Sequence, residues 1–297
     1  MSILSDGPNV ATFSIVARDP ATGDLGVAVA SKFLAVGAYV PFAEAGVGAV
    51  ATQAHMNTRF GPEALRMMAE GRSAAECIAR FRATDAGIAT RQVGIVSASG
   101  GSATHTGDAC HDWAGGVAES GLAAQGNILS GPGVLDALVR TFTGSSEPFP
   151  ERLLAALAAA DAAGGDRRGR QSAALLVVGA DKGYGGTSDR WIDLRVDDRP
   201  APIPELRRLL ELHRLFLDRP SQPPRQLSEK DIRWLQRLLL ERGHDDRQPT
   251  GRWDDRTEAA LESLFGVENL EERWTGGSFI DPVAWEYLWG TYGGEGP

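Results

Sequence analysis

Strand-like and helix-like segments alternate in groups through the first 217 residues, and this order restricts the folds open to the chain. Two β-patterned runs, Thr12–Arg18 and Leu25–Ser31, come first, and a turn containing Pro20 and Gly23 separates them. The remaining strands are expected at 46–53, 91–98, 102–106, 121–129, 171–178 and 191–196, and the helices at 62–70, 74–82, 132–142, 150–163 and 203–217.

Hairpin turns join most of these strands, as Ser99-Gly100-Gly101 does between the strands at 91–98 and 102–106. The sheets should therefore be mostly antiparallel, and the paired helices must cover their outer faces. We expect an α+β protein in which two stacked sheets lie between two helical layers, a four-layer αββα sandwich. A small all-α domain should follow it.

A proline-rich polar segment that begins at Asp218 cannot continue a helix and predicts an extended linker. Five of the seven tryptophans follow this segment. We therefore expect an αββα domain at 1–217, a linker at 218–226 and a helical domain at 227–297.

The bulk composition argues against several classes of function. A net charge of -9 and a pI near 5.1 oppose binding to nucleic acid or to an anionic membrane. The sequence contains no apolar run of about 18 residues, so no membrane span is expected, and the first residues lack the pattern of a secretory signal. Cys77 and Cys110 have no metal-ligand spacing, so we expect neither metal nor cofactor, and a reducing, cytoplasmic location.

Thr12 is the first residue of the first expected strand, and eleven residues precede it. A threonine that becomes N-terminal can act alone, because its α-amine, with a pKa of about 8, can accept the proton of its own hydroxyl. The amide nitrogen of an internal threonine cannot. Thr12 is thus either a nucleophile exposed by cleavage after Ala11 or an ordinary β-branched strand residue.

Six segments carry a resemblance to a known family: TFSIVARDP at 12–20, GDLGVAVASKF at 23–33, GVGAVATQA at 46–54, AAQGNILSGP at 123–132, GGDRRGRQSAALLVV at 164–178 and WIDLRVDD at 191–198. The chain resembles the N-terminal nucleophile (Ntn) hydrolases, and more closely the bacterial family known as domain of unknown function 1028. That resemblance implies the αββα sandwich and a threonine nucleophile at Thr12. It implies no particular substrate.

Three residues are candidates to support such a nucleophile. Asn127 could donate an amide N–H to an oxyanion, or could be a turn residue before the next helix. Ser31 could hydrogen-bond to the site from the neighbouring strand, or cap a turn. Lys32 is the lysine nearest to the site in the sequence, or a solvated residue at a strand end.

Polar residues beyond these could bind the substrate. Arg167, Arg168 and Arg170 could clamp a carboxylate or phosphate, or could pair with neighbouring acidic residues. His55 and Asn57 follow the strand at 46–53 and are candidates for the rim of a pocket.

The C-terminal part contains an amphipathic helix that starts near Ile232, a polar loop, the segment TGRWDDRT and a second helix. This order resembles the small helical peptidoglycan-binding domain over residues 228–275. The resemblance implicates Trp253, Asp254 and Arg256 in binding, while the alternative is that they hold the helices together.

Two functions follow from these patterns. The first is an amidohydrolase that acts on a small amide or a muropeptide-like ligand through Thr12. The alternative is a non-catalytic binding or scaffold protein whose C-terminal module binds peptidoglycan fragments or a partner. Homo-oligomer formation is a further expectation.

Overall fold

The computed structural model describes residues 12–293, and its internal contacts divide the chain between Leu209 and Leu210 into two compact units. Helix α5 (Pro202–Phe216) contains this division. The expected leader at 1–11 lies outside the described residues.

The first unit contains a six-stranded sheet of order β10-β9-β2-β1-β8-β7, in which every neighbouring pair is antiparallel. Its strands are β1 (Thr12–Arg18), β2 (Leu25–Ser31), β7 (Gly115–Glu119), β8 (Leu122–Asn127), β9 (Ser172–Val178) and β10 (Arg190–Val196). Strand β1 is central, and its first residue Thr12 is paired with Ser31 of β2 and Asn127 of β8. The start of β1 and the ends of β2 and β8 therefore lie side by side at one end of the sheet.

A second sheet of order β3-β4-β5-β6 packs on the first, and it is also antiparallel. Its strands are β3 (Pro41–Glu44), β4 (Gly48–Ala54), β5 (Arg91–Ser97) and β6 (Ser102–Thr106). Short 3-10 turns lie at Val36–Ala38, Ile88–Thr90 and Tyr184–Gly186.

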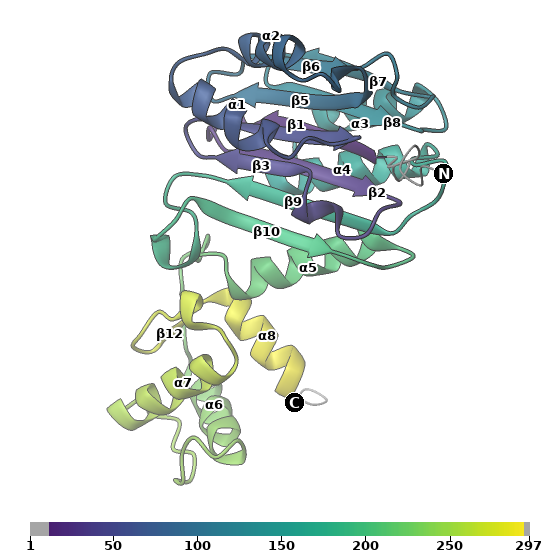
Figure 1. The fold of residues 1–297 in the computed structure, drawn as a ribbon. Helices are drawn as coiled ribbons and strands as arrows, with labels where there is room; N and C mark the ends of the chain where they lie inside the picture. The colour runs from purple at the N-terminus through teal and green to yellow at the C-terminus, as the bar shows by residue number, and fades with distance from the viewer. Residues whose placement is uncertain (1–11, 294–297) are drawn as a thin grey trace, which may run out of the picture. The chain divides into compact units, whose positions relative to one another are not determined.

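Helices cover the outer face of each sheet, which gives four layers (Figure 1). Helices α3 (Gly133–Gly144) and α4 (Phe149–Ala162) pack on the six-stranded sheet, while α1 (Phe60–Ala69) and α2 (Ala74–Thr84) pack on the four-stranded one. The unit is a mixed α/β structure with antiparallel sheets, as the hairpin pattern predicts.

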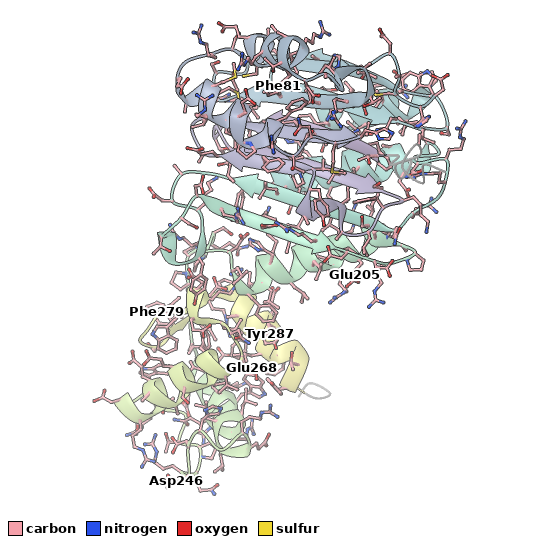
Figure 2. All side chains as sticks on the ribbon, in the orientation of Figure 1. Phe81, Glu205, Asp246, Glu268, Phe279 and Tyr287 are labelled. Atoms are coloured by element: carbon pink, nitrogen blue, oxygen red, sulfur yellow. The ribbon has the colours of Figure 1, made fainter. Side chains whose placement is uncertain are left out.

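The helical layer over the four-stranded sheet is fixed by local signals and by aromatic packing. The expected cap of α2 is present, because Ser73 and Glu76 form a reciprocal capping box. Phe81 of α2, labelled in Figure 2, stacks on Phe60 of α1 with 4.0 Å between the ring centroids.

Strands β3 and β7 were not predicted from the sequence. Both are edge strands of only four and five residues, and β7 is largely exposed. Neither PFAE nor GGVAE shows apolar alternation, because an edge strand with weakly buried faces does not need it.

The second unit is helical, with α6 (Glu229–Glu241), α7 (Asp255–Val267) and α8 (Pro282–Tyr292) around one apolar core. A two-residue ladder joins β11 (Arg225–Gln226) to β12 (Phe279–Ile280), and a 3-10 turn lies at Glu271–Arg273. Tyr287 of α8 donates a hydrogen bond of 2.9 Å to Glu268, and Figure 2 shows the two side chains together. Within residues 12–293, no helix has the length and hydropathy needed to cross a membrane.

Candidate functional site

Alternation along β1 places one row of side chains between the two sheets. Val16 belongs to a buried cluster that also contains Ala49 and Val96 of the other sheet, so Val16 faces the inter-sheet layer. Counting back by two residues puts Ser14 and Thr12 on the same face. The layer is apolar around Val16 and becomes polar where β1 begins.

Thr12 lies at this polar end and is fully buried. Its hydroxyl donates to the hydroxyl of Ser31 at 3.1 Å, and its carbonyl accepts a hydrogen bond of 3.1 Å from the side-chain amide of Gln53. The neighbouring strand β2 of the same sheet and strand β4 of the opposite sheet therefore each contribute a polar contact to Thr12.

Three glutamines, each fully buried, form a hydrogen-bonded network around this end of β1. Gln53 Nε2 donates to Gln92 Oε1 at 2.8 Å, and Gln92 Nε2 donates to the carbonyl of Gly126 at 2.8 Å. Ser14 joins Gln53 to Gln125, because its hydroxyl donates to Gln53 Oε1 and accepts from Gln125 Nε2, both at 2.6 Å. Buried amides need such partners, so the network specifies how the sheets stack here.

Asn127 lies opposite Thr12 in the sheet register and is also buried. Its Nδ2 donates to Gln92 Oε1 at 3.0 Å. An amide nitrogen carries two hydrogens, so this bond leaves a second one for another acceptor near Thr12.

Two strands end in strained residues directly after site residues. Ala54 follows Gln53 with a φ of 63°, and Ile128 follows Asn127 with a φ of 50°. The left-handed region is unfavourable for a residue with a β-carbon, and most of all for a β-branched one. Such strain persists where the surrounding contacts over-determine the backbone, and it is concentrated at functional sites.

The packing of the glutamines depends on Gly94 of β5. A β-carbon at this position would lie 1.9 Å from Gln125 Oε1, which is too close for any side chain. Gln125 Oε1 has no hydrogen-bond partner among the described residues. The glycine thus provides the space into which this amide projects.

A cleft of about 350 Å³ opens at the same end of the sandwich, lined by Phe33, Tyr39, Ala54, His55, Met56, Thr58 and Arg91. His55 therefore lies on its wall, as expected for a pocket residue. Asn57 lies behind the wall, where its amide donates a 3.0 Å hydrogen bond to Asp85.

Asp85 also neutralises the guanidinium of Arg91 in the cleft lining, since Arg91 Nε lies 3.1 Å from Asp85 Oδ2. Burial raises the pKa of Asp85, but hydrogen bonds from Asn57, the Gly87 N–H and Arg91 outweigh burial and hold it below its usual value. Arg91 in addition donates to the carbonyl of His55.

The basic residues at 167–170 pair largely within the protein. Arg168 makes an ion pair of 3.1 Å with the buried carboxylate of Asp166, and Arg170 one of 2.7 Å with Asp161. Arg167 donates to the carbonyl of Asp112 at 3.2 Å.

Asp166 also holds the strand end beside Thr12. It accepts a 2.7 Å hydrogen bond from the backbone N–H of Lys32, whose side chain is exposed. The structure therefore places Lys32 next to the site through its backbone.

Neither cysteine has the character of a nucleophile. Burial raises the pKa of Cys77 to about 11, and burial also raises the pKa of Cys110. Both thiols are therefore protonated at neutral pH, which leaves Thr12 as the stronger candidate. No group of three His, Cys, Asp or Glu between Thr12 and Gly293 is arranged to hold a metal ion.

The TGRWDDRT segment of the second unit is tied to helix α6 by Gln236. Gln236 Oε1 accepts hydrogen bonds of 2.8 Å from the N–H groups of Thr250 and Gly251, and its Nε2 donates to the carbonyl of Arg252 at 2.9 Å. Gly251 has a φ of 78° and lies against Glu229, so the tight loop requires glycine here.

The expected binding residues of this segment each have a structural contact. Asp254 caps α7 by accepting from the N–H of Thr257, and an ion pair of 2.6 Å with Arg247 lowers its pKa. Half-buried Trp253 donates to Glu258 at 3.4 Å. Arg256 pairs with Asp245 and Asp246 but remains 60% exposed, so it is the residue of the three most accessible to a ligand.

Comparison with known proteins identifies the first unit. The model of a family of unknown function, DUF1028, matches residues 12–206. The chain belongs to this family. A crystal structure of a DUF1028 protein from Silicibacter pomeroyi is 34% identical, covers 69% of this chain and 89% of its own, and superposes with a TM-score of 0.63.

A second family model, described as "Putative peptidoglycan binding domain", matches residues 215–288 of this DUF1028 protein. The sequence resemblance to a peptidoglycan-binding domain is thus confirmed, over a longer segment than the motif alone covered. No curated protein matches the chain.

Sequence reasoning missed the three network glutamines, although a signal for them exists. Each is a long polar residue in a strand run made mostly of small or apolar residues: GAVATQA, RQVGIVS and LAAQGN. An isolated glutamine at an inward-facing position of a fully buried strand indicates a buried hydrogen-bond network.

Proposed function

We propose that this DUF1028 protein is an Ntn-type amidohydrolase with an Ntn-hydrolase-like sandwich, in which Thr12 becomes active after residues 1–11 are removed. The observation that carries the proposal is the position of Thr12. It begins a central strand at the polar end of the inter-sheet layer, with its hydroxyl 3.1 Å from Ser31 and a neutral cleft at the same end.

The chemistry assigns two roles to one residue. The freed amine takes the proton of Oγ1 as this oxygen bonds to the substrate carbonyl carbon. When the C–N bond breaks, the ammonium returns the proton to the leaving amine, and an acyl-enzyme remains. Water, deprotonated by the same amine, then releases the carboxylic acid and restores the hydroxyl.

The negative oxygen of each tetrahedral intermediate needs hydrogen-bond donors. Asn127 offers the second hydrogen of Nδ2, and backbone N–H groups near the strand ends supply the others. Ser31 positions the Thr12 hydroxyl. Gln53 holds the Thr12 carbonyl, so that the new N-terminus stays in place after cleavage.

Intact mass measurement and N-terminal sequencing of the purified protein test the first step. We expect a chain that starts at Thr12 and hydrolyses small amides, while the Thr12→Ala variant is neither processed nor active. The Thr12→Ser variant keeps a hydroxyl and is the matched control. Full activity in a chain that retains residues 1–11 would exclude the proposal.

A second candidate function rests on the match to the peptidoglycan-binding domain. The second unit would bind muropeptide-like fragments, consistent with the predicted cytoplasmic location, and the first unit would serve as a scaffold. Arg256 and Trp253 are the candidate contacts, because Asp254 is occupied as a helix cap.

Titration calorimetry with a purified muropeptide tests this second function. We expect weaker binding in Arg256→Ala, while Arg242→Ala, an exposed arginine on the adjoining helix end, is unchanged. Homo-oligomer formation stays a prediction, and light scattering at several protein concentrations would decide it.

A further inference from the structure

The cleft at the Thr12 end of the sandwich has an apolar part, formed by Phe33, Tyr39 and Met56. The rings of Phe33 and Tyr39 meet edge to face with centroids 6.0 Å apart, and Met56 lies on the same wall. A volume of about 350 Å³ matches the lower range of small-molecule sites and holds a phenyl ring or a branched alkyl chain.

The connection of this cleft to Thr12 runs through short stretches of chain. Phe33 is two residues beyond Ser31, whose hydroxyl bonds to Thr12. Ala54 directly follows Gln53, whose amide bonds to the Thr12 carbonyl. The left-handed φ of 63° at Ala54 ends β4 at this point, so the chain turns to form the wall of the cleft instead of continuing the sheet.

Three arginines in this region are paired with carboxylates of the protein. Asp85 pairs with Arg91 at the cleft, and two of the three arginines at 167–170 pair with Asp166 and Asp161. At Arg91, Arg168 and Arg170 an acidic substrate group would have to displace a carboxylate of the protein. An apolar group needs only to exclude water from the aromatic and thioether surface, which is favourable.

We propose that the cleft lined by Phe33, Tyr39 and Met56 is the acyl-group pocket of the Thr12 site and selects a neutral, apolar acyl group. This inference rests on the proposed amidohydrolase function and adds a substrate class to it. It competes with the sequence-based expectation that the arginines bind an acidic group.

Binding is measured first, without reference to catalysis. The probes are 3-phenylpropanamide, succinamate and 4-aminobutanamide, titrated into the full-length protein at pH 8. We expect only 3-phenylpropanamide to bind. Met56→Glu, which places a carboxylate in the cleft, should weaken binding at least tenfold, and Met67→Glu on helix α1 should not change it.

A second variant keeps the test valid if Met56→Glu does not fold. Tyr39 is 45% exposed, so Tyr39→Ala enlarges the cleft at little risk to the core. We expect it to shift preference about tenfold from 3-phenylpropanamide toward the bulkier 2-naphthylacetamide. Absence of binding, or binding that neither Met56→Glu nor Tyr39→Ala alters, would overturn the inference.

Turnover separates the inference from the function on which it rests. Protein that starts at Thr12 is assayed on aminomethylcoumarin amides carrying 3-phenylpropanoyl, succinyl or 4-aminobutanoyl groups. Fastest release of the apolar acyl group supports both proposals. Fastest release of the succinyl group keeps the amidohydrolase and overturns the pocket assignment. Cleft binding without any turnover keeps the apolar ligand class and removes the amidohydrolase.

Discussion

The hydroxyls of Thr12 and Ser31 lie 3.1 Å apart at the register position where β1 begins and β2 ends. Antiparallel pairing brings the start of one strand beside the end of the next, so two residues separated by 19 positions meet at the end of the hairpin opposite its turn. The site is therefore built on strands, and its geometry is as rigid as the sheet.

Replacing Ser31 by alanine tests this contact. The hydroxyl orients Thr12 Oγ1, and the loss of one neutral hydrogen bond is worth about 1 kcal/mol, so we expect kcat to fall about fivefold with KM little changed. Amide hydrolysis by the processed protein measures it. Ser97→Ala, at the opposite end of β5 from Gln92, is the control, and an equal loss of activity in both variants would remove Ser31 from the site.

Replacing Gly94 by alanine tests the inter-sheet network. The new β-carbon would collide with Gln125 Oε1, and overpacking of this kind costs about 1–3 kcal/mol. Urea denaturation should show this loss of unfolding free energy. Gly133→Ala, with open space around the β-carbon, should be nearly neutral.

The double variant Gly94→Ala/Gln125→Ala makes the same test more specific. Removing the glutamine side chain restores the space that the new methyl occupies. We therefore expect the double variant to lose less unfolding free energy than the sum of the losses in the two single variants. Strictly additive losses would show that the contact between Gly94 and Gln125 does not limit packing.

Local signals in the sequence were sufficient for most of the elements. Strands β1 and β2 have the predicted bounds, and the capping box of α2 is present, because hydrophobic alternation and capping depend on neighbouring residues. The antiparallel layers follow from hairpins in the same way. Edge strands β3 and β7 escaped prediction because their pairing partners, and not their own residues, define them.

The candidate site was only partly predictable for the same reason. A family resemblance indicated Thr12, while Ser31 and Asn127 were candidates because of their hydrogen-bonding groups and their places at strand ends. The bond from Gln53 to Thr12 spans 41 positions, and no local pattern reports on such a contact. The pairing of Arg170 with Asp161 likewise depends on the turn that brings the end of α4 back to β9.

Arg273 and Asp281 form a buried ion pair of 3.0 Å in the second unit, with the two side chains 4% and 1% exposed. Arg273→Leu would leave the Asp281 carboxylate buried without its charge partner, which costs about 3–5 kcal/mol. Thermal and urea unfolding should both show the loss. Arg256→Ala removes a 60% exposed guanidinium and leaves Asp245 paired with Arg247, so it should cost less than about 1 kcal/mol.

The burial of His213 predicts that acid lowers the unfolding free energy of the second unit. Burial lowers the pKa of this imidazole, and Arg214 lowers it further, against the carboxylate of Asp218 at 3.5 Å, which raises it. In the unfolded chain the same histidine titrates near pH 6.5. As pH falls below that value, the imidazole binds a proton in the unfolded state but not yet in the folded state, so the unfolding free energy decreases.

We therefore expect urea unfolding to show a steeper loss of stability between pH 7 and pH 5 in the unmodified protein than in His213→Gln. Above pH 7 the histidine is neutral in both states, and the two stability curves should run parallel. His244→Gln, at a more accessible histidine of the same unit, should keep the original slope. Equal slopes for the unmodified protein and His213→Gln would show that the burial of His213 does not contribute to acid sensitivity.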